Sequence, residues 1–166
     1  MGLQITAYNR LELVENCKEQ EKDYFENSNS RVITLFDNPE FPFHIGTLKG
    51  QTLYKVKGQS FSFRSGNTKS FKDWKDWLAK VGGYKSLADV WKSKHYGPFV
   101  ELLNFSDSEG TIGPVLARKL SQDFNDYEQF AIEKSTELVY GYDFYKNWKK
   151  AFNLAAKENG VVIFKW

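Results

Sequence analysis

The sequence has only one cysteine and two histidines. A single cysteine, Cys17, excludes a disulfide within the chain and a zinc site built from cysteines. The histidines, His44 and His95, lie far apart in the sequence, which disfavours a histidine-rich metal centre. No apolar run approaches the about 18 residues needed to cross a membrane, and no charged-then-apolar leader opens the sequence. We therefore expect a cytoplasmic protein without a membrane partner.

The sequence also lacks a large excess of either charge, because it has 23 Lys and Arg and 21 Asp and Glu, which gives a net charge of +2. Nucleic-acid-binding proteins usually carry a clear basic excess, so a nucleic-acid partner is not expected. Lysines do gather at 69–85 and at 146–150, interleaved with aromatic residues at helical spacing. This pattern is typical of the solvated face of amphipathic helices, with a basic binding surface as the less favoured interpretation.

Aromatic residues, by contrast, are abundant, with 5 Trp, 9 Tyr and 14 Phe. They predict an aromatic core and exclude a disordered chain. The length of 166 residues fits one globular domain, 1–166. A chain of this size buries roughly 70% of the surface that it exposes when unfolded.

Hydrophobic periodicity predicts both strands and helices. Alternation predicts strands over 1–14, 31–36 and 161–166 and a hairpin over 52–56 and 60–64. Spacing of three to four predicts a helix that begins with Ser70 as N-cap and ends at Gly82-Gly83. Further helices are expected over 86–94, over 114–131 and from Asp143 to Asn159, while 98–103 fits a short helix or a buried strand. The fold class is α+β, with a small mixed or antiparallel sheet that includes both terminal strands and packs against several amphipathic helices.

Arg64 is the first candidate for ligand binding. It ends the second hairpin strand and precedes a turn that contains Gly66, with Lys69 close behind. Its planar guanidinium can hold a phosphate or a carboxylate through paired hydrogen bonds. A structural salt bridge explains the same residue equally well.

The stretch 99–114 is the second candidate, because four side chains that bind or catalyse fall within nine residues: Glu101, Asn104, Asp107 and Glu109. Where this turn enters the helix at Pro114, free backbone N–H groups favour an anion. Asp107 and Glu109 could equally cap that helix. As functional groups, they could hold a hard cation such as Mg²⁺ for phosphoester hydrolysis, or accept hydrogen bonds from a base or ribose. No P-loop, GxSxG, HExxH or EF-hand pattern accompanies them.

Four segments resemble a family of uncharacterised proteins of phages, prophages and bacteria: MGLQITAY at the start, 61–84, 97–114 and the late FYKNWKKAFNLAA. The first family block, Phe-Arg-x-Gly followed by a hydroxyl residue, an aromatic residue and a tryptophan, falls on Phe63, Arg64, Gly66, Thr68 or Ser70, Phe71 and Trp74. The second block falls on Glu101, Asn104, Phe105, Ser106, Asp107, Glu109 and Gly110. The family more often has cysteine at the position of Ser108, so the resemblance supports no thiol mechanism in this chain.

The resemblance implies an accessory protein that acts on host defence, and the favoured hypothesis is that it sequesters a small nucleotide-like ligand. Arg64 and Lys69 would contact phosphate, and Phe71 or Trp74 would stack on a base. The expected ligand-binding set is Arg64, Gly66, Thr68, Lys69, Phe71, Trp74, Glu101, Asn104, Ser106, Asp107 and Glu109.

Two alternatives stay open. One is a metal-dependent nucleotide hydrolase, with Mg²⁺ held by Asp107 and Glu109. The other is a protein-binding inhibitor of a host enzyme. No other cofactor is expected, and the sequence leaves the ligand, the oligomeric state and the host target open.

Overall fold

The computed structural model describes residues 2–14, 31–41, 43–92, 96–105 and 109–166. Their helices and strands follow one another in the order β1 (Gln4–Tyr8), β2 (Leu11–Leu13), β3 (Val32–Thr34), β4 (Leu53–Val56), β5 (Ser60–Arg64), α2 (Thr68–Val81), α3 (Leu87–Lys92), α4 (Val100–Asn104), β6 (Gly110–Ile112), α5 (Pro114–Asp126), α6 (Glu128–Glu133), α7 (Gly141–Ala155) and β7 (Val161–Lys165). None of these helices is both long and apolar enough to cross a lipid bilayer.

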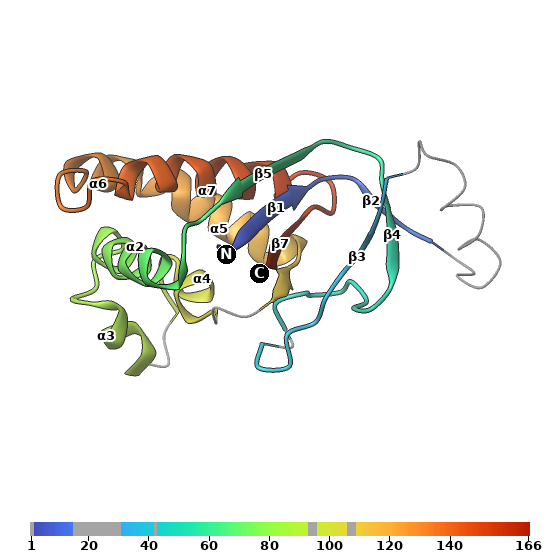
Figure 1. Ribbon diagram of the computed structural model, residues 1–166, viewed down its shortest axis with the longest axis horizontal. Coiled ribbons are helices and arrows are strands. Elements are labelled where there is room, and N and C mark those ends of the chain that lie inside the picture. Colours follow the sequence, from blue (N-terminus) through green and yellow to red (C-terminus); the bar gives the residue numbers. More distant parts are fainter. Residues whose placement is uncertain (1, 15–30, 42, 93–95, 106–108) are drawn as a thin grey trace.

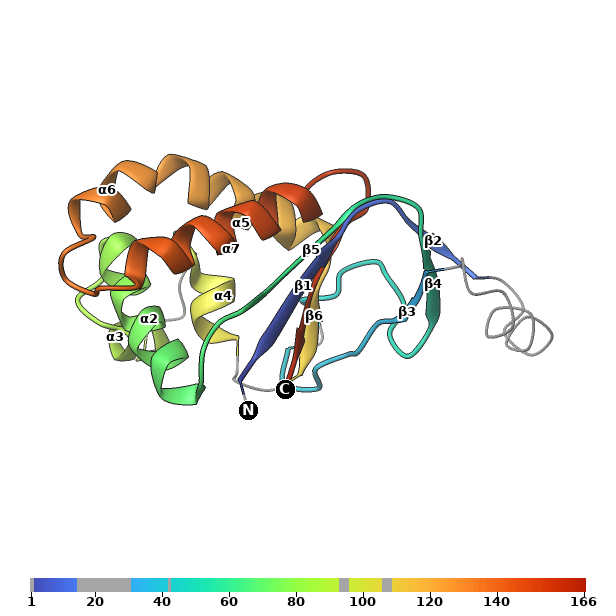
Figure 2. The same ribbon diagram turned by 45° about the horizontal axis from the view of Figure 1, so that its top comes forward.

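The predicted α+β class and the pairing of the two terminal strands are confirmed. The main sheet has the strand order β5-β1-β7-β6, and every neighbouring pair in it is antiparallel. β1 and β7 lie side by side, with Gln4 opposite Lys165 and Tyr8 opposite Val161. The ends of the chain therefore lie close together in both views (Figures 1 and 2).

The helices cover one face of the main sheet, and the smaller sheet β2-β4-β3 lies on the other side of the molecule (Figure 2). Alternate residues of β1, such as Ile5 and Ala7, are fully buried against the helices. On the opposite face, Val161 and Ile163 of β7 pack with Leu35 and Tyr54 of the smaller sheet region. The main sheet thus separates two hydrophobic clusters.

Stacked aromatic rings form the centre of the larger cluster. Trp148 of α7 stacks on Trp74 of α2, with ring centroids 5.3 Å apart, and on Phe71 at 5.8 Å. Phe152 follows one turn further along α7, at 5.9 Å from Trp148. Each of these side chains is fully buried. Burial of one large apolar side chain stabilises the fold by about 1.5–3 kcal/mol, so this stack accounts for the attachment of α2 and α7 to each other.

Four expectations about individual elements need correction. The hairpin expected over 52–56 and 60–64 does not form, because β4 pairs with β2 and β3 in the smaller sheet whereas β5 pairs with β1 in the main sheet. Asn67, not Ser70, caps α2, and its side chain accepts a hydrogen bond of 2.9 Å from the Ser70 N–H. The helix expected over 114–131 is divided, since α5 ends at Asp126 and α6 begins at Glu128. Gly110–Ile112, expected as part of a polar turn, is the buried strand β6. For 98–103, where a short helix and a buried strand both fitted the sequence, the structure has a helix, α4.

Candidate functional site

The first predicted block forms one exposed connection between β5 and α2. Arg64 is exposed at the end of β5, and Thr68 and Lys69 are exposed in the first turn of α2. Gly66 lies between them with φ at +82°, a conformation that favours glycine, and its carbonyl accepts a hydrogen bond from Leu3 N–H. The structure therefore brings these four residues together at the surface.

The two aromatic residues of that block lie elsewhere. Phe71 and Trp74 are fully buried in the ring stack on Trp148, and Trp74 Nε1 donates a hydrogen bond of 3.1 Å to the Gly141 carbonyl. Both rings are thus occupied by the core, and neither offers a free face to a base in this structure.

The second predicted block is only partly described. Glu101 and Asn104 are half-buried on α4, and Glu109 is exposed immediately before β6. Ser106 and Asp107, the other two members, lie outside the described residues. The Mg²⁺ pair of Asp107 and Glu109 therefore stays a prediction. Within the described ranges, no group of three or more His, Cys, Asp or Glu is placed to hold a metal ion.

The two blocks touch through their buried parts. Lys75 of α2 is buried, and its Nζ donates a hydrogen bond of 3.2 Å to the Phe105 carbonyl at the end of α4. Their exposed parts are separated, because Arg64 ends one edge strand and Glu109 precedes the other. Three strand spacings lie between β5 and β6, or about 14 Å. The described residues thus do not join Arg64 and Glu109 in one site.

Glu101 belongs to an ion-pair network. Lys119 of α5 lies 2.7 Å from both Glu101 and Asp123, and it also donates a hydrogen bond to the Gly97 carbonyl. Asp123 in turn accepts the N–H of Phe99 at 2.8 Å, and Phe99 has a left-handed φ of +62°. Burial raises the pKa of Asp123, although Lys119 and the Phe99 N–H oppose the shift. Glu101 therefore belongs to the network that stabilises the N-terminal end of α4.

His44, which lies near Glu101, is half-buried against two aromatic rings. Its ring lies 5.0 Å from the Phe41 ring and 5.3 Å from the Phe105 ring. Burial lowers the pKa of His44.

The structure reveals a basic groove that was not among the predicted sites. It has a volume of about 700 Å³ and runs between β5, α7 and the residue that precedes β3. Its lining residues are Arg31, Gln59, Ser60, Phe61, Lys146, Lys149, Lys150, Asn153, Leu154 and Lys157. Five of these ten are cationic and none is acidic. We call it the lysine groove.

The cations of the lysine groove are held to different degrees. Lys150 Nζ lies 4.3 Å above the centre of the Phe61 ring, a cation–π distance. Lys146 pairs with the exposed Asp143 at 2.8 Å, and Lys149 pairs with Glu128 of α6 at 2.7 Å. For Arg31 and Lys157, the described residues supply no ion-pair partner.

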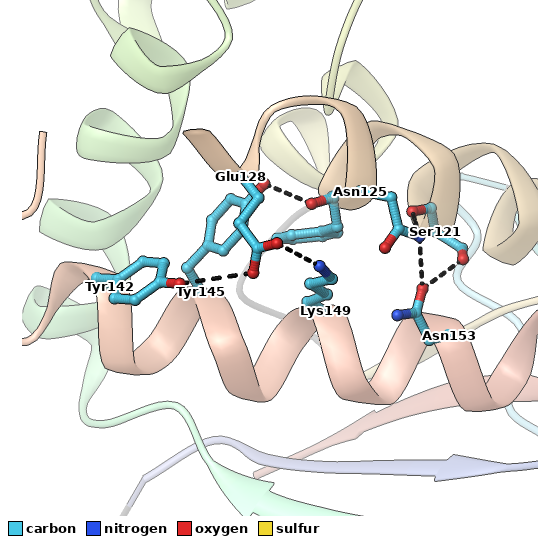
Figure 3. A network of polar contacts seen from close by, with 8 residues as sticks. Ser121, Asn125, Glu128, Tyr142, Tyr145, Lys149 and Asn153 are labelled. Carbon is cyan, nitrogen blue, oxygen red and sulfur yellow. Dashed lines mark hydrogen bonds and ion pairs between the residues drawn. The ribbon is translucent and has the colours of Figure 1, made fainter. Parts of the chain in front are cut away.

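A polar network between α5, α6 and α7 borders the lysine groove (Figure 3). Glu128 accepts hydrogen bonds from Lys149 Nζ and, at 3.5 Å, from the Tyr142 hydroxyl. One turn further along α7, Asn153 Oδ1 accepts from Ser121 Oγ at 2.6 Å and from Asn125 Nδ2 at 3.0 Å. Lys149 and Asn153 thus belong both to this network and to the wall of the groove.

The lysines of the groove were visible in the sequence, but their pattern was interpreted as a solvent-exposed helix face and not as a binding site. Lys146, Lys149 and Lys150 belong to the lysine cluster at 146–150, which we interpreted from the sequence as a solvated helix face. The placement of Phe61 and Arg31 beside that face comes from tertiary structure alone. Comparison with protein-family models, with curated proteins and with solved structures gives no match, so the geometry carries the functional argument.

Proposed function

We propose that the protein binds a small nucleotide-like anion in the lysine groove. The observation that carries this proposal is a groove of about 700 Å³ with five cationic residues, no carboxylate and one aromatic ring in its lining. Pockets for small molecules commonly have volumes of about 300–1,000 Å³. Cations that share a concave surface repel one another and concentrate anions, so phosphate groups are the natural counterpart.

The lining suggests how such a ligand would be held. Lys150 and Lys157 place ammonium groups on flexible stems, which suit phosphate oxygens as compact charges. Phe61 lies beneath Lys150 and would contact a base by stacking once the ammonium turns to a phosphate. Arg31, also in the lining, can hold phosphate oxygens through its planar guanidinium group.

The residues that line the groove favour ligand binding over catalysis. The ten lining residues contain no histidine, cysteine, aspartate or glutamate. A hydrolase normally needs such a group as base or metal ligand. Sequestration of a nucleotide signal, as the resemblance to phage proteins implies, needs binding alone.

The test is titration calorimetry of the protein with ADP, ADP-ribose and cyclic di-AMP at low salt. We expect binding of at least one of these ligands, and a loss on the order of tenfold in Lys150→Ala and in Lys157→Ala, because each removes one charge-assisted contact. Lys92→Ala is the matched control, since Lys92 is an exposed lysine on α3, outside the groove.

The bound ligand should be recovered intact after heating the complex, by chromatography of the supernatant. Absence of binding to all three ligands would refute the proposal. Recovery of a hydrolysed product, lost after EDTA treatment, would instead support the metal-dependent hydrolase.

A further inference from the structure

The orientation of the Asn153 amide follows from the hydrogen bonds around it. The Ser121 carbonyl lies 2.7 Å from one terminal atom of the Asn125 side chain. A backbone carbonyl only accepts, so that atom is Nδ2. The same nitrogen lies 3.0 Å from the nearest terminal atom of Asn153, which must accept its second hydrogen and is therefore Oδ1.

This assignment leaves the other end of the Asn153 amide as a donor. Oδ1 already accepts from Ser121 Oγ and Asn125 Nδ2. Nδ2 carries two hydrogens and has no hydrogen-bond partner among the described residues. In Figure 3 it lies on the side of Asn153 that faces Lys149 along α7. Since both residues line the lysine groove, two donors, one neutral and one cationic, stand next to each other on its wall.

Neighbours on other helices, α5 and α6, hold these two donors in place. Glu128 holds Lys149, and Ser121 with Asn125 holds Asn153. A side chain that is already ordered loses less conformational entropy when a ligand binds. Lys149 is half-buried, whereas Lys146, Lys150 and Lys157 are exposed.

We infer that Asn153 is a specificity-determining residue of the lysine groove, whose Nδ2 donates a hydrogen bond to a phosphate oxygen of the ligand, beside Lys149. This inference rests on the proposed function and adds the group that positions the phosphate. Ser121 and Asn125 are positioning residues, because they act on the ligand only by fixing the Asn153 amide. The exposed lysines attract the anion, and Asn153 fixes where its phosphate lies.

The decisive variant is Asn153→Asp, tested by calorimetry with the same ADP, ADP-ribose and cyclic di-AMP. The carboxylate keeps the acceptor for Ser121 and Asn125 but replaces the donor with a negative oxygen. We expect affinity to fall at least tenfold in Asn153→Asp and about fivefold in Asn153→Ala, while the thermal midpoint of unliganded Asn153→Asp stays at or above that of the native protein. Ser121→Ala, which removes one restraint on the amide, should show a smaller loss than Asn153→Ala.

Salt dependence separates this role from simple charge attraction. Asn153→Ala should lower affinity by the same factor at low and high salt, because the lost donor is neutral, whereas the loss in Lys150→Ala should shrink as salt screens the charge. The inference is overturned if native protein binds one of the ligands and both Asn153 variants bind it within twofold of native. If native protein binds none of the three, the proposed function itself fails and this inference fails with it.

Discussion

At the scale of single residues, Lys119 and Asp123 make the most consequential polar contacts outside the lysine groove. Lys119 contacts Glu101, Asp123 and the Gly97 carbonyl, and Asp123 also accepts the Phe99 N–H. The network fixes the left-handed residue that starts α4. Burial raises the pKa of Asp123, so its charge costs more in the folded protein than in the unfolded chain.

We predict that Asp123→Asn changes how stability depends on pH. A raised folded pKa means that the folded state holds the proton more tightly, so stability from Asp123 is fully present below the unfolded pKa of about 4 and is lost as pH rises through the folded pKa. Asparagine resembles the protonated form and keeps an acceptor for Phe99. The unfolding free energy of native protein, minus that of the variant, should therefore fall as pH rises from about 4 toward neutrality.

Urea unfolding of both proteins across this pH range measures the difference. Other carboxylates are common to the two proteins and cancel. A difference that rises with pH would contradict the prediction, since it would mean that Lys119 outweighs burial and lowers the pKa.

At the scale of elements, the buried Lys75 joins α2 to the end of α4. Its Nζ donates to the Phe105 carbonyl and lies 4.9 Å from the centre of the Phe71 ring. We predict that Lys75→Met lowers the unfolding free energy by about 1–3 kcal/mol, because methionine fills the space but leaves a buried carbonyl without this donor. Denaturant unfolding checks this, with Lys72→Met, an exposed lysine of the same helix, as control. Equal stability of the two variants would contradict it.

Elements with a sustained pattern could be predicted from the sequence. The aromatic stripe of Phe71, Trp74 and Trp77 marked α2, and alternation at Leu3, Ile5 and Ala7 marked β1. β6 was missed because Gly110-Thr111-Ile112 is too short to show a period and follows an acidic turn. All three residues are buried, and pairing with β7, remote in sequence, is what makes them a strand.

The candidate site could be predicted less well than the fold. The residues from Arg64 to Lys69 are neighbours in the sequence, so the sequence could predict that they lie together in the connection between β5 and α2. Stacking on Phe71 or Trp74 was inferred from residue type, but helical spacing does not show whether an aromatic ring faces the core or a ligand. The lysine groove depends on the proximity of Phe61, Arg31 and α7, which no local pattern encodes.

At the scale of the whole molecule, the pairing of β1 with β7 can be tested by a crosslink. Gln4 lies opposite Lys165, and Cα atoms of opposed antiparallel residues are about 4.5–5.5 Å apart, within the range of a disulfide. We predict that Gln4→Cys with Lys165→Cys, in a Cys17→Ser background, oxidises to an intramolecular disulfide and gains about 2–4 kcal/mol of stability, since the bridge closes nearly the whole chain into a loop.

Free-thiol titration and thermal unfolding with and without reductant measure both effects. The control pair is Glu12→Cys with Lys165→Cys, because Glu12 lies on β2 in the other sheet. Failure of the first pair to crosslink, or equal crosslinking of both pairs, would contradict the observed register.

The position of β7 also sets the order in which the protein can be built. β7 is the last described element to leave the ribosome, yet it lies between β1, the first, and β6. Helices α2 to α7 can collapse on their aromatic rings during synthesis, but until β7 is inserted, the strands on either side of it each lack a neighbour. Unpaired strand edges template association with other chains. Completion of the main sheet therefore waits for the last of the described elements, and until then the newly made chain passes through an interval in which protection by a chaperone is valuable.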